Sequence, residues 1–230
     1  MLKYDTILFD ADGTLFDFFR SEREALISVF KIYGYELTDE EVREYSAIND
    51  SLWKALERRE VTKEELRIKR FELFCESRGF VCDCHSIAKD YTDMLSKQHF
   101  LIDGALEICR TLSEFCRLFI ITNGIEYVQK NRMELSPLKE YFDALFISGE
   151  IGYEKPSVHF FDAVKRGISD FSSERSLVVG DSLTSDMKGG IDAGVDCCYF
   201  DPKGNGIPQN MPIKYRIEKL SELQKIILTD

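Results

Sequence analysis

The stretch Asp10-Ala11-Asp12-Gly13-Thr14 follows directly on an apolar run at residues 6–9. A short apolar run that is followed within a few residues by a glycine is typical of a parallel strand that opens into a loop, and open α/β sheets bind their ligands at that end. Positions i and i+2 of an extended chain point the same way, so the Asp10 and Asp12 carboxylates can face one cleft. Two such carboxylates can have different roles: one stays ionised as a nucleophile or metal ligand, and the other holds a proton and acts as an acid. An Asp-Gly turn that merely ends a strand would also explain the pair.

Two more segments have the same setting. Thr122-Asn123-Gly124 follows an apolar run and precedes a helical stretch. A hydroxyl and free backbone N–H groups at a helix start form an anion site, although a simple N-cap needs no more. Lys155 stands before Pro156, which keeps the lysine backbone extended. Its ammonium could offset charge that develops on a phosphate, whereas a loop lysine is usually just solvated.

Asp181 and Asp186 follow the apolar run at residues 177–179 and Gly180. Hard carboxylate oxygens near a phosphate suit Mg²⁺, and an acidic residue in a first helical turn is the plain alternative. Each segment alone is weak support. Because all four follow predicted strands, together they predict one phosphate site assisted by Mg²⁺.

Strand-length and helical patterns alternate along the chain, which predicts an α/β protein with a doubly wound, Rossmann-like parallel sheet. The expected strands are residues 6–9, 118–122, 144–148, 177–179, 196–200 and 215–217. The expected helices between and after them are residues 105–115, 126–135, 158–166, 185–193 and 221–228.

A helical insertion interrupts this alternation after the first strand. Residues 21–33, 39–58, 63–78 and 86–98 read as amphipathic helices, and two of them begin with capping-box patterns. We therefore expect an α/β core formed by residues 1–15 and 100–230 and a helical cap formed by residues 16–99. The two crossings, near residues 16–19 and 99–103, would act as hinges, with the cap as a lid.

The composition excludes several classes of partner. The 230 residues carry a formal net charge of -11, which argues against a nucleic-acid polymer or an anionic membrane. No stretch has the length of a membrane span and no signal peptide fits the N-terminus, so we expect a cytoplasmic protein. Seven cysteines without regular spacing fit reduced thiols. Cys82-x-Cys84-His85, with Cys75 nearby, is spaced more tightly than zinc pairs and no second pair follows, so zinc is not predicted.

The four segments, in this order, resemble the motifs of the haloacid dehalogenase superfamily of phosphohydrolases, and the insertion resembles its helical cap. The resemblance implies that Asp10 attacks phosphorus and that Asp12 serves as acid and then base. It implies that Thr122, Asn123, Gly124 and Lys155 bind the phosphoryl group. Mg²⁺ would be held by Asp10, the Asp12 backbone carbonyl and Asp181, with Asp186 as a direct or outer ligand. Family members that displace halide lack the carboxylate at the Asp12 position, so phosphate chemistry is implied.

A closer resemblance is to the pyrimidine 5′-nucleotidase branch, on the residues around Asp10, the stretch Asn49-Asp50-Ser51-Leu52-Trp53, Arg70-Phe71 and the stretch from Ile147 to Gly152. It implies a small phosphorylated substrate, a nucleoside monophosphate. We expect a monomer or a small homo-oligomer. The alternatives are a phosphatase for sugar phosphates or other small metabolites, a phosphosugar mutase, and a binding protein without turnover.

The cap should select the substrate, because the residues of the four motifs would contact only its phosphoryl group. Phe16, Phe18 and Phe19 could form an apolar wall or stack on a base, and domain-interface core is the alternative role. Asn49 and Trp53 are four residues apart on one helix face and could touch a ligand. Trp53 would serve equally well as cap core.

Overall fold

The computed structural model describes residues 2–228. The chain divides into two compact units, one containing the residues up to Asp17 and from His99 onward, the other Phe18–Gln98. The crossings lie side by side in the first unit, where Asp17 N donates to Phe100 O at 2.9 Å and Ile102 N to Leu15 O at 2.9 Å.

The first unit contains a six-stranded sheet in the order β3-β2-β1-β4-β5-β6, and every pair of neighbours is parallel. This confirms the predicted doubly wound sheet. The strands are β1 Thr6–Phe9, β2 Arg117–Thr122, β3 Ala144–Ile147, β4 Ser176–Gly180, β5 Asp196–Phe200 and β6 Tyr215–Ile217. They agree with the predicted strands to within one residue at each end.

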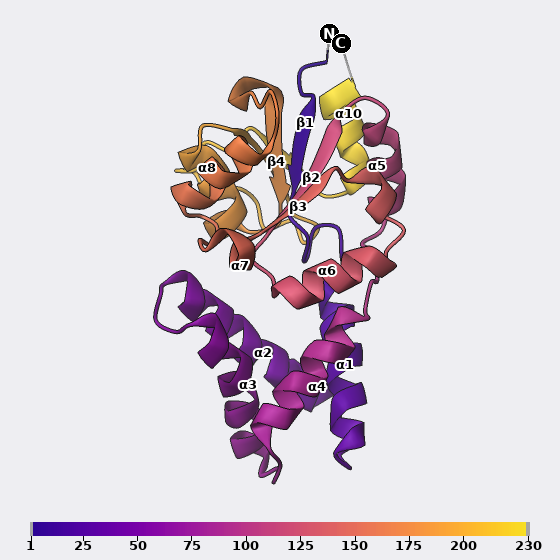
Figure 1. The fold of residues 1–230 in the computed structure, drawn as a ribbon, viewed down its shortest axis with the longest axis vertical. Helices are drawn as coiled ribbons and strands as arrows, with labels where there is room; N and C mark the ends of the chain where they lie inside the picture. The colour runs from indigo at the N-terminus through magenta and orange to yellow at the C-terminus, as the bar shows by residue number, and fades with distance from the viewer. Residues whose placement is uncertain (1, 229–230) are drawn as a thin grey trace. The chain divides into compact units, whose positions relative to one another are not determined.

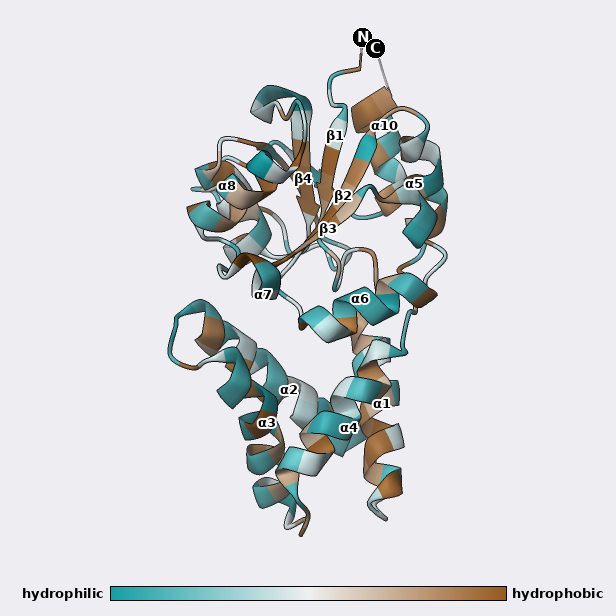
Figure 2. Ribbon diagram, viewed as in Figure 1, coloured by the Kyte–Doolittle hydropathy of each residue, from teal (hydrophilic) through white to brown (hydrophobic). Residues whose placement is uncertain are grey.

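Helices cover both faces of the sheet (Figure 1). Ile7 and Phe9 of β1 point into one apolar cluster and Leu8 into the other, as the two-residue period of a strand requires. Much of β1, β2, β3 and β4 is accordingly apolar (Figure 2). Helices α5 Ala105–Ser113 and α10 Leu223–Leu228 pack on the first face, and α8 Val158–Gly167 and α9 Lys188–Asp192 on the second.

Further short elements lie between the strands of this unit. They are α6 Glu126–Leu135, α7 Ser148–Ile151, the 3₁₀ turns Lys139–Tyr141, Ser173–Arg175 and Leu220–Glu222, and the π-helical segment Leu183–Met187. The sequence predicts one regular helix over residues 185–193, and this is wrong at its start. The π-helical segment precedes α9 because the Ser182 hydroxyl caps Ser185 N and Ser182 N binds the Asp186 carboxylate.

The second unit is all-helical, with α1 Phe18–Ile32, α2 Asp39–Glu57, α3 Lys63–Arg78 and α4 Cys84–Ser96. Thr38 and Thr62 form the capping boxes that the sequence predicts, with Glu41 and Glu65 as their partners. Helix α4 begins two residues before its predicted start, because the Asp83 carboxylate accepts a hydrogen bond from His85 N.

Aromatic rings fill the core of the helical unit. Phe30, Tyr45, Phe71, Phe74 and Tyr91 are fully buried and meet at centroid distances of 5.2–5.7 Å. Such contacts stabilise a small unit beyond simple area burial. Among the described residues, no helix is both long enough and apolar enough to cross a membrane.

Candidate active site

The Lys155 side chain lies at the centre of a cluster of acidic groups. Its buried ammonium donates to Asp10 Oδ1 and Asp186 Oδ1, both at 2.6 Å, and to Ile121 O at 2.7 Å. These three acceptors come from the ends of β1 and β2 and from the segment after β4. Residues far apart in sequence therefore meet at the carboxyl edge of the sheet, as their positions after strands predict.

Asp181 completes a group of three carboxylates. Oxygens of Asp10, Asp181 and Asp186 all lie within 4.8 Å of one another. Asp10 and Asp186 are buried, whereas Asp181 is exposed. Asp181 is therefore the residue of this group with the most contact with solvent.

Burial and mutual repulsion govern the charge of this cluster. Burial raises the pKa of Asp10 well above its usual value, and the charges of Asp186 and Asp181 add to that effect while Lys155 opposes it. The pKa of Asp181 is raised in the same direction, first by desolvation and then by Asp186. Burial lowers the pKa of Lys155, but the charges of Asp10 and Asp186 outweigh it and raise that pKa overall. A single lysine therefore incompletely neutralises the carboxylates.

The loop after β2 holds Lys155 in place through its backbone. Asn123 Nδ2 donates to Lys155 O at 2.9 Å, and Lys155 N donates to Asn123 Oδ1 at 2.8 Å. Thr122 Oγ1 accepts from Gly124 N at 3.0 Å. The predicted phosphate-binding residues thus lie next to the acidic cluster, and Asn123 has a positioning contact that the sequence did not suggest.

Asp12 lies in the adjacent loop and its carboxylate is bound by helix α6. Gln129 Nε2 donates to Asp12 Oδ2 at 2.5 Å, and Arg132 Nη1 donates to Asp12 Oδ1. Arg132 is completely buried, with its guanidinium 5.1 Å from the Phe16 ring centroid. The sequence did not predict either helix residue as part of the site, because polar residues of an amphipathic helix are usually assigned to its solvent-exposed face. A signal was present, because Gln129 and Arg132 share the buried stripe of α6 with Val128 and Met133.

Two glycines allow carboxylates to approach the backbone. Gly13 has a φ of 87°, and a methyl group there would overlap the Asp181 carboxylate. A methyl group at Gly180 would overlap the Asp186 carboxylate. Both glycines are therefore required by the close packing of the acidic cluster.

Comparisons with known proteins identify the family of this chain. The family model described as haloacid dehalogenase-like hydrolase matches residues 7–200. The chain belongs to this family. The predicted superfamily, and with it the expectation of a hydrolytic enzyme, is confirmed.

Relatives within the family span nearly the whole chain. The HAD-hydrolase YfnB of Bacillus subtilis is 37% identical over 99% of this chain and 97% of its own length. A solved structure of YfnB bound to magnesium has a TM-score of 0.93 at 36% identity, covering 97% of this chain and 98% of that one. The pyrimidine 5′-nucleotidase PynA of Streptococcus pneumoniae is 35% identical over 86% of this chain and 84% of its own length. The pyrimidine 5′-nucleotidase YjjG of Escherichia coli is 30% identical over 98% and 99%, respectively.

The chemistry of the donor set suits the Mg²⁺ expected from the family resemblance. Three carboxylates supply hard oxygen ligands within one small volume. Burial and mutual repulsion raise the pKa of Asp10, so a cation there would relieve an unfavourable concentration of negative charge.

The predicted substrate-selecting residues lie in different surroundings. Phe16 is buried in the core of the α/β unit, Phe18 is half-buried at the start of α1, and Phe19 is 64% exposed. Trp53 is half-buried on α2. Asn49 is buried, and its amide already binds Glu22 Oε1 at 2.7 Å and Arg70 Nη1 at 3.1 Å. A contact between these residues and substrate stays a prediction.

Proposed function

We propose that this chain is a Mg²⁺-dependent phosphatase that hydrolyses pyrimidine nucleoside 5′-monophosphates. The observation that carries the chemistry is the Lys155 ammonium bound to both Asp10 and Asp186, beside the carboxylate of Asp181. Support for the substrate class comes from PynA and YjjG, pyrimidine 5′-nucleotidases that are 35% and 30% identical to this chain.

In the proposed first step, a carboxylate oxygen of Asp10 attacks phosphorus and the bond from phosphorus to the ester oxygen breaks. Lys155 orients the attacking group, because it holds Asp10 Oδ1 at 2.6 Å and is itself fixed by Asn123. The leaving alkoxide takes a proton from Asp12, which provides general acid catalysis. The product is an aspartyl phosphate and a free nucleoside.

In the second step, Asp12 removes a proton from water, and the resulting nucleophile attacks the same phosphorus. The bond between Asp10 and phosphorus breaks, so that inorganic phosphate leaves and the Asp10 carboxylate is restored. Arg132 and Gln129 bind Asp12 and suit the ionised form required of a base.

Asp10 and Asp181 are the proposed side-chain ligands of Mg²⁺, together with the Asp12 backbone carbonyl. Bound there, the ion would supply positive charge to the phosphoryl oxygens. Asp186 fits an outer position better, because one of its oxygens binds Lys155 at 2.6 Å and the other binds Ser182 N at 3.1 Å. Thr122 and the backbone N–H groups of Asn123 and Gly124 would hold the phosphoryl oxygens.

A phosphatase for sugar phosphates or other small metabolites would use the same residues, because the acidic cluster meets only the phosphoryl group. A phosphosugar mutase would return that group to an isomer of its substrate and release little phosphate. A cytoplasmic location and a monomeric or small homo-oligomeric state also stay predictions.

Phosphate release from a panel of substrates tests this proposal. With Mg²⁺ present, we expect UMP, dUMP or dTMP to give a higher kcat/KM than purine nucleotides and sugar phosphates. EDTA should abolish release, and Mg²⁺ should restore it. A preference for a sugar phosphate would contradict the substrate class, and turnover that resists EDTA would contradict the metal requirement.

A further inference from the structure

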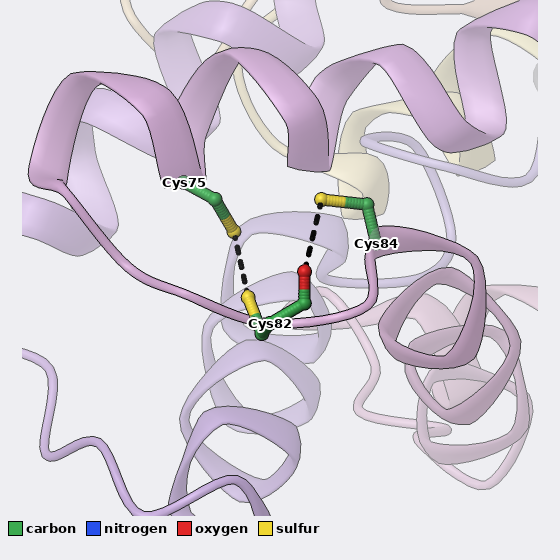
Figure 3. Close-up of side chains that lie close together, drawn as sticks. All are labelled: Cys75, Cys82 and Cys84. Atoms are coloured by element: carbon green, nitrogen blue, oxygen red, sulfur yellow. Dashed lines mark hydrogen bonds between the residues drawn. The ribbon is translucent and has the colours of Figure 1, made fainter.

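Three cysteines of the helical unit meet at the connection between α3 and α4, far in sequence from the four phosphate motifs. Cys75 lies in the last turn of α3, Cys82 in the following loop and Cys84 at the first position of α4 (Figure 3). Their Sγ atoms all lie within 4.8 Å of one another. The Cys75 and Cys82 sulfurs are 3.3 Å apart.

The local backbone explains this convergence. Gly79 ends α3 with a φ of 68°, in the left-handed region that favours glycine, and Phe80 N binds Cys75 O at 2.9 Å. This reversal returns the chain to the end of α3 and brings Cys82 next to Cys75. Asp83 then caps α4, so that Cys84 lies in the first helical turn, where negative charge is favoured.

We propose that Cys75, Cys82 and Cys84 form a binding site for a thiophilic cation such as Zn²⁺ or Cu⁺. The sequence argued against zinc because Cys82 and Cys84 are closely spaced and no second pair follows. The fold supplies the third sulfur from the preceding helix instead. Soft thiolate ligands select such ions over the Mg²⁺ that suits carboxylates.

The distances between the sulfurs fit such an ion after a small adjustment. A metal–sulfur bond of about 2.3 Å places neighbouring sulfurs about 3.8 Å apart in a tetrahedral site and about 4.0 Å apart in a trigonal one. The 3.3 Å separation of Cys75 and Cys82 would widen by roughly half an ångström, which a loop residue such as Cys82 can accommodate. Two of the cysteines could instead form a disulfide, but a disulfide would not explain why a third sulfur lies beside them.

The polar side chains next to the three cysteines, Asp83 and His85, are not proposed as ligands of the ion. The Asp83 carboxylate is engaged by His85 N at 3.1 Å and by Ser86 Oγ at 2.6 Å. The His85 side chain is 73% exposed and lines a groove of about 310 Å³ with residues of α3. Solvent is therefore the proposed fourth ligand of a tetrahedral ion, and a trigonal ion would need none.

Binding must displace the thiol protons. Burial raises the pKa of Cys75, with a further contribution from its hydrogen bond to Cys82, and burial also raises the pKa of Cys84. Three thiols that bind one Zn²⁺ as thiolates release three protons, and no oxidant or reductant takes part.

A metal titration of the full chain tests this site. The reduced, oxygen-free protein would be titrated with Co²⁺ in excess Mg²⁺, which keeps the carboxylate cluster occupied. We expect a thiolate-to-cobalt charge-transfer band that saturates at one equivalent and disappears when Zn²⁺ is added. Zn²⁺ should also raise the midpoint of thermal unfolding.

Substitutions at the two half-buried cysteines provide the specific comparison. Cys82→Ser and Cys84→Ser should fold, as judged by circular dichroism, and should lose both the band and the Zn²⁺-dependent rise in midpoint. Cys116→Ala removes a buried thiol of the α/β unit and should keep both. The absence of a band in the unaltered protein would overturn the proposal, and so would an equal band in the Cys82→Ser and Cys84→Ser variants. Oxidation of two thiols by peroxide without any cobalt band would identify a redox pair and also overturn it.

Discussion

At the scale of single residues, the catalytic proposal depends on how the Asp12 carboxylate is held. Gln129 and Arg132 each bind one of its oxygens, and both come from the buried stripe of α6. A general acid must lie within reach of the leaving group to act on it. The two helix residues are therefore proposed to position the Asp12 carboxylate for that proton transfer.

Replacing Gln129 with alanine should slow the chemical step more than it weakens substrate binding. We expect kcat for a nucleoside monophosphate to fall roughly tenfold with KM nearly unchanged, because a hydrogen bond to a charged group worth about 1.5 kcal/mol is lost. The loss should be smaller for an aryl phosphate, whose leaving group needs less protonation. Steady-state kinetics on both substrates measure the difference.

Two comparisons separate positioning from general damage. Lys130→Ala removes a half-exposed side chain of the same helix, which pairs with Glu126 and Glu150, and should leave kcat within about twofold because such pairs contribute little. In an Asp12→Ala background, Gln129→Ala should have little further effect. Equal effects of Gln129→Ala with and without the Asp12 carboxylate would contradict this role.

The residue types of the site could be predicted from the sequence, but their partners could not. Asp10, Lys155 and Asp181 could be predicted as site residues because each follows a predicted strand. Their order along the chain also resembles the order of the family motifs. The contact of Asn123 with the Lys155 backbone depends on how two loops meet across 32 residues of chain. No local pattern specifies such a contact.

At the scale of elements, the loop after β5 shows how one buried carboxylate can organise a connection. The Gly- and Pro-rich sequence of residues 202–212 predicts a surface loop. Asp201 is buried at its start and accepts hydrogen bonds from Asn205 N at 3.0 Å, Gly206 N at 2.8 Å and Arg216 Nε at 2.8 Å. Burial would raise the pKa of Asp201, but these hydrogen bonds outweigh it and lower the pKa overall.

This lowered pKa gives stability a defined dependence on pH. A carboxyl group with a lower pKa in the folded state stabilises the fold above its unfolded pKa of about 3.9, and loses that contribution as pH falls through the folded value. We expect Asp201→Asn to lower the free energy of unfolding by about 2 kcal/mol near neutral pH, since hydrogen bonds to a charged group are lost. The difference from the unaltered protein should shrink below about pH 4.

Urea unfolding at several pH values measures this effect. Asp192→Asn serves as a control, because Asp192 forms an exposed pair with Lys188 and should change stability by less than about 0.5 kcal/mol. A stability difference for Asp201→Asn that stays constant from neutral to acid pH would show that the charge of Asp201 is unimportant.

The elements themselves follow closely from local sequence. Strand bounds agree because short, mostly apolar runs end at polar or glycine positions. The two capping boxes are complete within four residues. The start of the helix over residues 185–193 differs because the Asp186 side chain turns back to Ser182 N and Lys155. A tertiary contact to a distant lysine thus changes a local helix start.

At the scale of the whole molecule, the residues proposed for the chemical step and those proposed for substrate choice lie largely in different units. The α/β unit contains every residue proposed for phosphoryl transfer, and the helical unit contains most of those proposed for substrate choice. Periodicity and motif order predict both units. They do not predict that Asn49 would be buried against Glu22 and Arg70, because this depends on the packing of three helices.

The central claim is that Asp10 accepts the phosphoryl group, and chemical trapping tests it most directly. The enzyme would be quenched with acid during turnover of UMP with Mg²⁺, reduced with borohydride and digested for mass spectrometry. Because reduction converts an aspartyl phosphate to homoserine, we predict homoserine at position 10, and neither this product nor phosphate release in the Asp10→Asn variant. An unmodified Asp10 during active turnover, or an Asp10→Asn variant that still releases phosphate, would contradict the account.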